Sequence, residues 1–444
     1  MKLASAVFRH AEAAVRELLR FAGPADQLLS RYFRSHGELG QRDRAFIAEA
    51  SFAVLRRRRS LEAAAGSAEP RALLAAALLH TLGFSGRALG ELVDQELVER
   101  VRSARAEALP DAVRADLPDW LWQRLAAERG RDEAMRLAQG LLNPAPLDLR
   151  VNLARIGREE VLQRLARDGI VARAMPYSPA GVRLAEKPAI NHHALFRDGL
   201  IEVQDEGSQL LALLLAPRRG EMVADYCAGA GGKTLALAML MRGTGRVYAM
   251  DVSAKRLYAL GARAARAQVS NVHSIALASD NDARAKRLAG KLERVLVDAP
   301  CSGFGTLRRN PDLKWRHAPA AIAELAQKQR RILEAAARLV KPGGRLVYAT
   351  CSILREENEA IVDDFQAAHP EFKALSCAQL LAAQRIELDS GERLRLAPHL
   401  HGTDGFFAAA FERAATSSTP DKNPLHTAGY IASEASRTMP GATE

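Results

Sequence analysis

From residue 221 onward, apolar runs of strand length alternate with longer helical patterns. The strand-like runs are MVADYC, RVYAMD, VHSIAL, RVLVDAP and GRLVYAT, which begin at residues 222, 246, 272, 294 and 344. Runs that are apolar throughout predict strands buried on both faces, as in a parallel sheet covered by helices. We therefore expect a doubly wound, Rossmann-like α/β domain over residues 216–414. RLRLAPH and GFFAAAFER near its end predict an added antiparallel pair.

The chain before this domain has two different patterns. Residues 1–143 carry apolar residues at three- and four-residue spacing, which predicts an all-α domain. Its clearest helical segments are AEAAVRELLRF, ADQLLSRYF, RDRAFIAEASFAVLRRR, PRALLAAALLHTLG and DWLWQRLAAERG. After an Asn-Pro-Ala-Pro linker, short strand patterns around one helical pattern predict a small α+β unit over residues 146–215. Residues 415–444 are polar and predict a disordered tail.

The charge balance is strongly basic. Lys and Arg number 63 against 52 Asp and Glu, which gives a formal charge of +11. This excess favours a polyanionic partner such as RNA, although a basic enzyme without such a partner is the alternative. The run Arg56–Arg59 predicts a solvated helix end or, less often, a phosphate contact.

The four cysteines are too few and too scattered for a disulfide framework, and no CxxC pair is present for zinc. We therefore expect no metal. The N-terminal stretch reaches Arg9 and Glu12 before any long apolar run, so no signal peptide is expected, and no run is long enough to span a membrane. These features predict a cytoplasmic protein without a membrane partner. The sequence does not fix the oligomeric state, and a monomer is the default expectation.

A glycine-rich segment, DYCAGAGGKT (225–234), follows the first predicted strand and opens a helix. Glycines let the backbone approach a ligand, and a helix N-terminus offers free N–H groups. The segment does not match a P-loop, because position 227 is Cys, and it does not match GxGxxG, because position 234 is Thr. A tight turn without a ligand is the alternative reading.

Acidic residues follow three successive strands of the predicted sheet. Asp251 ends the second strand and is placed to accept ribose hydroxyls, whereas Asp280, or alternatively Asp282, is placed to meet an adenine amino group. Each could instead be a helix N-cap. A ribose-binding acid beside a glycine loop without a phosphate motif favours S-adenosylmethionine, which has no phosphate.

Two cysteines lie where neighbouring strands end, Cys301 after the fourth strand and Cys351 after the fifth. An isolated free cysteine is usually a small buried hydrophobe. Two thiols beside an adenosine-type loop instead suggest covalent chemistry on a pyrimidine. A thiolate that adds to C6 of cytosine makes C5 nucleophilic enough to attack a sulfonium methyl group. Asp298, at the end of the fourth strand, is the candidate acid at N3 of the ring.

At these residues the chain resembles the bacterial Fmu/Sun branch of the Nop/Sun family of RNA cytosine-5 methyltransferases. The resemblance is carried by VQDEGSQL (203–210), DYCAGAGGKT, MDVSAKRL, LVDAPCSGFGTLRRNPDLKW, YATCSILREENE and HGTDGFFAAAF. It implies a class I methyltransferase domain. The early segment GELGQRDRAFIAEASFAVLRR (37–57) resembles the NusB-like RNA-binding domain attached to this branch.

The resemblance also implies residue roles. It makes Cys351 the nucleophile and Cys301 the residue needed for product release, with Lys233 and Asp298 beside them. The implied S-adenosylmethionine site comprises Cys227, Ala228, Gly229, Ala230, Gly231, Gly232, Lys233, Asp251, Arg256, Asp280 and Asp298. The family commonly has Pro where this chain has Ala230, which leaves the loop less stiff. The implied substrate is small-subunit ribosomal RNA with its target base looped or flipped out.

Rival interpretations differ in class. A non-catalytic RNA-binding factor would not need the two cysteines or Asp298, and an NAD-dependent oxidoreductase does not fit Thr234. Transfer RNA or DNA remain alternative substrates. DNA cytosine-5 enzymes place their nucleophile in the Pro-Cys segment, so the roles of Cys301 and Cys351 discriminate between these classes.

Overall fold

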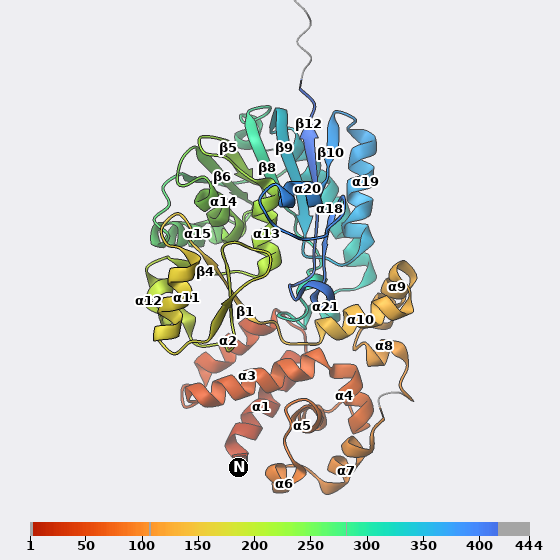
Figure 1. Ribbon diagram of the computed structural model, residues 1–444. Helices are drawn as coiled ribbons and strands as arrows, with labels where there is room; N and C mark the ends of the chain where they lie inside the picture. The colour runs from red at the N-terminus through yellow and green to blue at the C-terminus, as the bar shows by residue number, and fades with distance from the viewer. Residues whose placement is uncertain (1–2, 106–107, 281, 416–444) are drawn as a thin grey trace, which may run out of the picture. The chain divides into compact units, whose positions relative to one another are not determined.

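The computed structural model describes residues 3–105, 108–280 and 282–415 (Figure 1). In this part of the chain, helices come first, a small sheet follows, and a large sheet with helices on both faces completes the fold. The predicted disordered tail lies outside the described residues, apart from its first residue. Among the described residues, the structure contains no helix with the length and apolarity needed to cross a membrane.

The large sheet has the strand order β10-β12-β9-β8-β5-β6-β7, with β11 paired to β12. Its strands are β5 Met222–Asp225, β6 Arg246–Asp251, β7 Val272–Ala276, β8 Leu292–Asp298, β9 Val340–Thr350, β10 Phe372–Leu375, β11 Leu394–Leu396 and β12 Phe406–Arg413. Strands β5 to β9 are parallel, whereas β10, β11 and β12 pair antiparallel. The doubly wound fold is confirmed, and so is the late antiparallel pair, to which β10 adds a third strand.

The order of the strands fixes where a ligand can bind. From β5 the chain moves to β6 and β7 on one side and then returns to β8 on the other. The switch point therefore lies between β5 and β8, where the loops diverge and leave a crevice at the carboxyl ends of the strands.

Alternate residues of the buried strands pack into opposite helical layers. Val295 and Val297 of β8 belong to the core with α18 and α19, whereas Leu296 belongs to the core with α13 and α14. The helices of this domain are α13 Glu206–Leu215, α14 Gly232–Leu240, α15 Ala254–Arg266, α16 Ala283–Lys286, α17 Leu313–Arg316, α18 Pro319–Ala337, α19 Glu359–Ala368, α20 Cys377–Ala382 and α21 Pro398–His401. Burial on both faces explains why the strands are apolar throughout rather than alternating.

The small sheet is antiparallel, with the order β2-β3-β1-β4. Its elements are β1 Leu147–Val151, α11 Arg158–Arg167, β2 Ala172–Ala174, β3 Gly181–Leu184, α12 Ala194–Arg197 and β4 Ile201–Val203. Its core contains Leu149, Val182 and Ile201. Helix α13, which closes the unit predicted over residues 146–215, packs instead in the core of the large sheet.

The N-terminal helices have two cores rather than one. They are α1 Ser5–Leu18, α2 Ala25–Ser35, α3 Gln41–Arg56, α4 Arg58–Ala65, α5 Pro70–His80, α6 Gly86–Leu89, α7 Gln95–Ser103, α8 Asp111–Arg114, α9 Asp119–Arg129 and α10 Arg131–Leu141. Helices α1 to α7 share a core that runs from Phe8 to Val101. Helices α8 to α10 pack instead against Phe304, Ile353 and Leu354 of the large-sheet domain. These contacts do not test the domain boundaries predicted near residues 143 and 215, which stay predictions.

The basic run at the end of α3 makes internal contacts. Arg56 donates to a backbone oxygen of the loop after β8, and Arg59 donates to Asp119 at 2.6 Å. Arg58 lies over the ring of Trp315, 5.4 Å from its centroid. Arg57 lines a cavity of about 780 Å³. Most of the run is therefore neither a solvated helix end nor free for phosphate.

Candidate active site

The glycine-rich loop joins β5 to α14 at the switch point. Gly229 and Gly231 have φ values of +55° and +85°, which only glycine adopts readily. The loop is tied to β6, because the Ala228 N–H donates to the Met250 carbonyl and the Gly229 N–H donates to Asp251 Oδ2, each at 2.9 Å. The predicted loop residues are thus held against the predicted ribose acid.

We expect Gly231→Ala to destabilise the fold more than Gly229→Ala. A Cβ atom at Gly231 would overlap the Leu260 side chain, whereas one at Gly229 would have no heavy atom within 4 Å. Each change forces alanine into the left-handed region at a cost of about 1–2 kcal/mol, and overlap at Gly231 adds about 1–3 kcal/mol. Urea denaturation of both variants without cofactor measures the difference. Equal losses of unfolding free energy would contradict the packing argument.

Asp251 is buried at the end of β6, where it accepts two hydrogen bonds and forms one ion pair. Besides the bond from Gly229, Oδ1 accepts from the Ser253 N–H at 2.7 Å and lies 3.2 Å from the guanidinium of Arg256. A carboxylate has about four acceptor positions, so one remains. Arg256, whose side chain is 55% exposed, is free to move and leave a second.

The two adenine-edge candidates differ in their partners. Asp282 caps α16, accepting from Arg284 and from the Ala278 N–H, and these bonds hold its pKa well below the usual range. Asp280 makes an ion pair with Arg331 at 3.5 Å, and its side chain is about one-third exposed. Of the two, Asp280 is the one with acceptor capacity left.

Lys233 and Asp298 form an ion pair between the first turn of α14 and the end of β8. The distance from Nζ to Oδ2 is 2.6 Å. Burial is the largest single effect and works to lower the pKa of Lys233, but the charge and hydrogen bond of Asp298 together with the charges of Asp225 and Cys351 outweigh it and raise that pKa. Lys233 is therefore a cation that lies close enough to Cys351 to feel its charge.

The two predicted thiols are neighbours. Cys301 and Cys351 are free, and their Sγ atoms lie 3.4 Å apart. The hydrogen bond with Cys351 and burial raise the pKa of Cys301, so Cys301 keeps its proton in this pair. Burial and the charges of nearby aspartates likewise raise the pKa of the loop thiol, Cys227. The structure thus brings Cys301, Cys351, Lys233 and Asp298 together at one edge of the sheet.

Glu357, which the sequence analysis does not identify, holds the two cysteine loops together. It is fully buried, and its Oε2 accepts from the hydroxyls of Ser302 and Ser352, each at 2.5 Å. Its Oε1 accepts from the Ser302 N–H at 2.8 Å and from Gln329 at 3.0 Å. Each serine follows one of the cysteines, so this one carboxylate fixes the distance between the thiols. The only signal in the sequence is the serine after each cysteine.

Asp225 provides a test of whether the crevice fits a cationic cofactor. Its Oδ2 accepts from Thr234 at 2.7 Å, but its buried Oδ1 has no hydrogen-bond partner. Burial raises the pKa of Asp225 to about 6, although the bond from Thr234 opposes the shift. A buried carboxyl oxygen without a donor fits the amino group of S-adenosylmethionine. Sequence reasoning did not single out this residue.

Comparison with known proteins agrees with this geometry. A family model described as 16S rRNA methyltransferase RsmB/F matches residues 212–412, and another, described as an RsmF/B-like ferredoxin-like domain, matches residues 117–191. The solved structure of PH0851 superimposes with a TM-score of 0.76 at 26% identity, covering 93% of this chain and all of that one. The fold is that of the Rossmann-like class I methyltransferases, and the cofactor is S-adenosylmethionine.

Two curated relatives narrow this class to one family. Both bear the name probable ribosomal RNA small subunit methyltransferase B. The one from Synechocystis is 37% identical over 67% of each chain, and the one from Bacillus subtilis is 35% identical over 69% of this chain and 70% of its own. The chain belongs to the RsmB/F family and is an S-adenosylmethionine-dependent rRNA methyltransferase.

Proposed function

We propose that the protein methylates C5 of a cytidine in 16S ribosomal RNA, with Cys351 as the nucleophile. One observation carries the proposal: the 3.4 Å approach of two free thiols beside the Lys233–Asp298 ion pair. Methylation of ring nitrogens or ribose oxygens needs no thiol, whereas C5 of cytosine needs a nucleophile at C6. The same observation disfavours a non-catalytic RNA-binding factor, which would not need paired thiols.

The residues divide the work in this scheme. The Cys351 thiolate forms a bond to C6, the ring double bonds shift toward N3, and N3 takes a proton that Asp298 relays from Lys233, which leaves C5 nucleophilic. S-Adenosylmethionine would supply the methyl group that C5 takes, with S-adenosylhomocysteine as the leaving group. A base then removes the C5 proton, the S–C6 bond breaks, N3 returns its proton through Asp298 to Lys233, and Cys351 leaves as thiolate. Lys233 stabilises negative charge on Cys351, and Cys301, which keeps its proton at rest, assists the final release.

Asp251 is proposed to bind the ribose of the cofactor, and we expect Asp251→Asn to weaken cofactor binding. Loss of a charged acceptor costs about 1.5–3 kcal/mol, or roughly 10- to 150-fold in affinity. Isothermal titration with S-adenosylhomocysteine measures the change. Asp282→Asn is the matched control, because Asp282 is already used as a helix cap. An equal loss in both variants would rule out the assignment.

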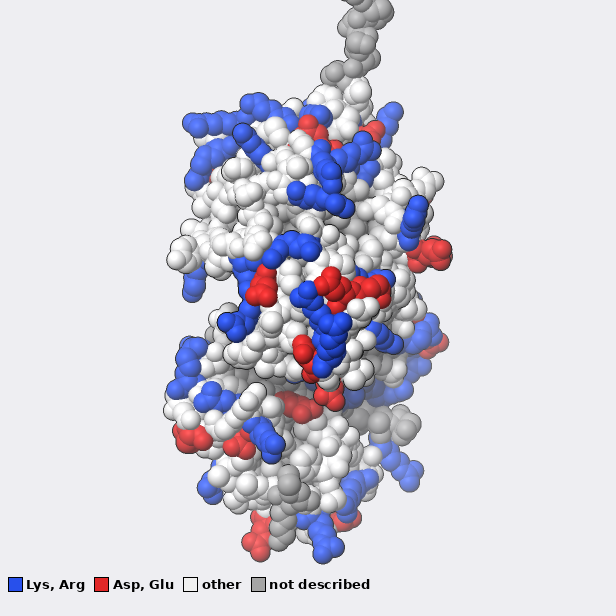
Figure 2. Space-filling model, turned by 60° about the vertical axis from the view of Figure 1, so that its left-hand side comes forward, with Lys and Arg blue, Asp and Glu red and all other residues white. Residues whose placement is uncertain are grey.

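The N-terminal helices are proposed to be a NusB-like domain that grips RNA together with the small sheet. The arginines that line the cavity in the helical region, Arg57, Arg105 and Arg114, support this role. Figure 2 shows Lys and Arg side chains spread over one face of the molecule, with Asp and Glu between them. This distribution supports contact with RNA phosphates over an extended surface rather than at one basic patch.

RNA affinity is expected to fall steeply with salt. Aromatic residues make up only 5% of the chain, so few bases can stack and phosphate contacts dominate binding. About six phosphate contacts would cost roughly 10³-fold in affinity between about 50 and 200 mM salt. Filter binding of a 16S rRNA fragment across this range tests the slope. A flat response would show that binding does not rest on phosphates.

The test of the proposed reaction is site-specific. Bisulfite sequencing of 16S rRNA from a strain that lacks the gene, and from the same strain carrying it again, locates any 5-methylcytidine. The proposal expects one cytidine that loses and regains bisulfite resistance. Labelled cofactor that transfers methyl groups to rRNA without producing a resistant cytidine would place the reaction at another atom. Transfer RNA treated in the same way tests the alternative substrate.

A further inference from the structure

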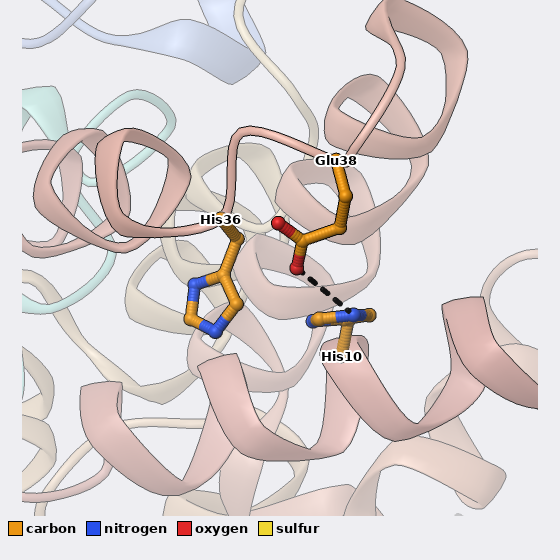
Figure 3. A group of neighbouring side chains, drawn as sticks. All are labelled: His10, His36 and Glu38. Carbon is orange, nitrogen blue, oxygen red and sulfur yellow. Dashed lines mark ion pairs between the residues drawn. The ribbon is translucent and has the colours of Figure 1, made fainter.

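Two histidines and a glutamate converge on the helical domain, far along the chain from the methyltransferase residues. His10 lies on α1, His36 directly follows α2, and Glu38 lies in the connection to α3. Figure 3 shows the three side chains pointing toward one another. One ring nitrogen of each histidine and one carboxylate oxygen all lie within 4.8 Å of one another, and His10 Nε2 is 3.7 Å from Glu38 Oε1.

Tyr32 orients both imidazole rings. Its backbone carbonyl lies 2.8 Å from His36 Nδ1, and because a carbonyl only accepts, that nitrogen carries the hydrogen. The Nε2 atom of His36 is then the unprotonated nitrogen, which is the form a metal ion binds. The Tyr32 hydroxyl lies 2.9 Å from His10 Nδ1, and the Tyr32 ring stacks on His36 with centroids 4.1 Å apart. Metal-binding histidines usually have their second nitrogen held in this way.

We propose that His10, His36 and Glu38 bind a zinc ion, with water as the fourth ligand. Two imidazoles and one carboxylate suit Zn²⁺, whereas Mg²⁺ and Ca²⁺ prefer sites made of oxygen atoms. Tetrahedral ligands about 2.0–2.2 Å from zinc lie about 3.3–3.6 Å apart, so the side chains need only small movements. Glu38, whose side chain is 61% exposed, has the freedom to make them.

The site would join α1 to the connection between α2 and α3. These segments are separated by more than twenty residues, and their ligands have no motif spacing, which is why the cysteine pattern alone predicts no metal. Glu38 is exposed and both histidines are partly exposed, so the ion would exchange with solvent. Its effect is to stabilise the helical domain, separately from methyl transfer.

Anomalous diffraction from crystals of the full chain soaked in ZnCl₂ tests the site directly. The proposal expects a zinc peak between His10, His36 and Glu38. A peak only at Cys301 and Cys351, whose thiols are also able to bind zinc, would overturn it, as would no peak. Zinc titration then compares His36→Gln with His273→Gln, a change at an exposed histidine on β7. We expect a loss of affinity on the order of 100-fold for the first and none for the second.

A separate experiment tests whether Tyr32 orients the two histidines. Tyr32→Phe removes the hydroxyl beside His10 and should lower zinc affinity by about tenfold, because a second-sphere partner is lost. The control is Tyr258→Phe, a change at a tyrosine that is 86% exposed. Zinc should raise the melting temperature of the wild type by a few degrees and leave His36→Gln unchanged. Equal zinc affinity in the wild type and His36→Gln would end the proposal.

Discussion

Cys351→Ala is expected to lower methyl transfer by about 10⁴-fold or more and to leave no covalent protein–RNA species, because it removes the sulfur that we propose attacks C6. The neighbouring thiol of Cys301 lies only 3.4 Å away in the wild type. The variant removes the hydrogen bond with Cys351 that contributes most to the raised pKa of Cys301, but burial and the charges of Glu357 and Asp298 still raise that pKa. It is therefore a poor substitute nucleophile. Cofactor affinity should not change, because the variant alters none of the residues assigned to the cofactor site.

Cys301→Ala is expected to give the opposite result. The Cys351 sulfur still attacks C6 and the methyl group is still transferred, but release of the product slows. The covalent species then accumulates to about one per enzyme and survives denaturing electrophoresis with labelled RNA. Single-turnover methyl transfer should remain within about tenfold of wild type, whereas multiple turnover stops.

Cys377→Ala is the matched control for loss of a thiol. This cysteine is buried on α20, away from the other two, and its sulfur contacts a backbone oxygen of β12 at 3.7 Å. Its removal should cost some stability and leave turnover intact. If Cys301→Ala abolished the adduct and Cys351→Ala trapped it, the two roles would have to be exchanged. The enzyme would then resemble the DNA cytosine-5 class in its choice of nucleophile.

The strands of the large sheet were predictable because they are buried on both faces and are therefore apolar along their whole length. Order along the chain then placed Asp251, Asp298, Cys301 and Cys351 at the same edge. β10 was missed because Phe372 is its only fully buried residue, and an edge strand with two exposed positions carries no apolar run. The second helical core was missed for a different reason: the partners of α8 to α10 lie some two hundred residues further along the chain.

Contacts between distant segments also explain what the sequence leaves open at the site. The sequence places both thiols at strand ends but does not give their separation, which depends on the register of β8 and β9. It also leaves Asp282 as an alternative to Asp280, because both follow the same strand. Only the cap contacts of Asp282 separate them. Hydrogen-bond partners that lie nine to fifty residues apart in the chain, such as Thr234 and Asp225, leave no periodic signal in the sequence.

Glu357→Gln is expected to lower the rate of adduct formation by about 10- to 100-fold while leaving cofactor affinity unchanged. The carboxylate accepts from both serines that follow the cysteines, so its charge and geometry set the thiol separation. Glutamine has nearly the same shape, and the serine hydroxyls are able to reverse their roles, so the fold should survive. A misplacement of about 1 Å between reacting groups costs about 10²-fold in rate.

A merely structural role for Glu357 is distinguished by pH dependence. The negative charge of Glu357 contributes to the raised pKa of Cys301, after the larger effects of Cys351 and of burial. Removing that charge lowers this pKa, because the thiolate is no longer repelled. If product release uses the Cys301 thiolate, the release rate rises with pH as that thiol loses its proton. This rising limb of the pH profile should then move to lower pH in Glu357→Gln. Ser302→Ala, which removes one hydroxyl but keeps the charge, is the matched control and should leave the limb in place. An unshifted limb in Glu357→Gln, together with a lowered melting temperature, would mean that Glu357 supports the fold alone.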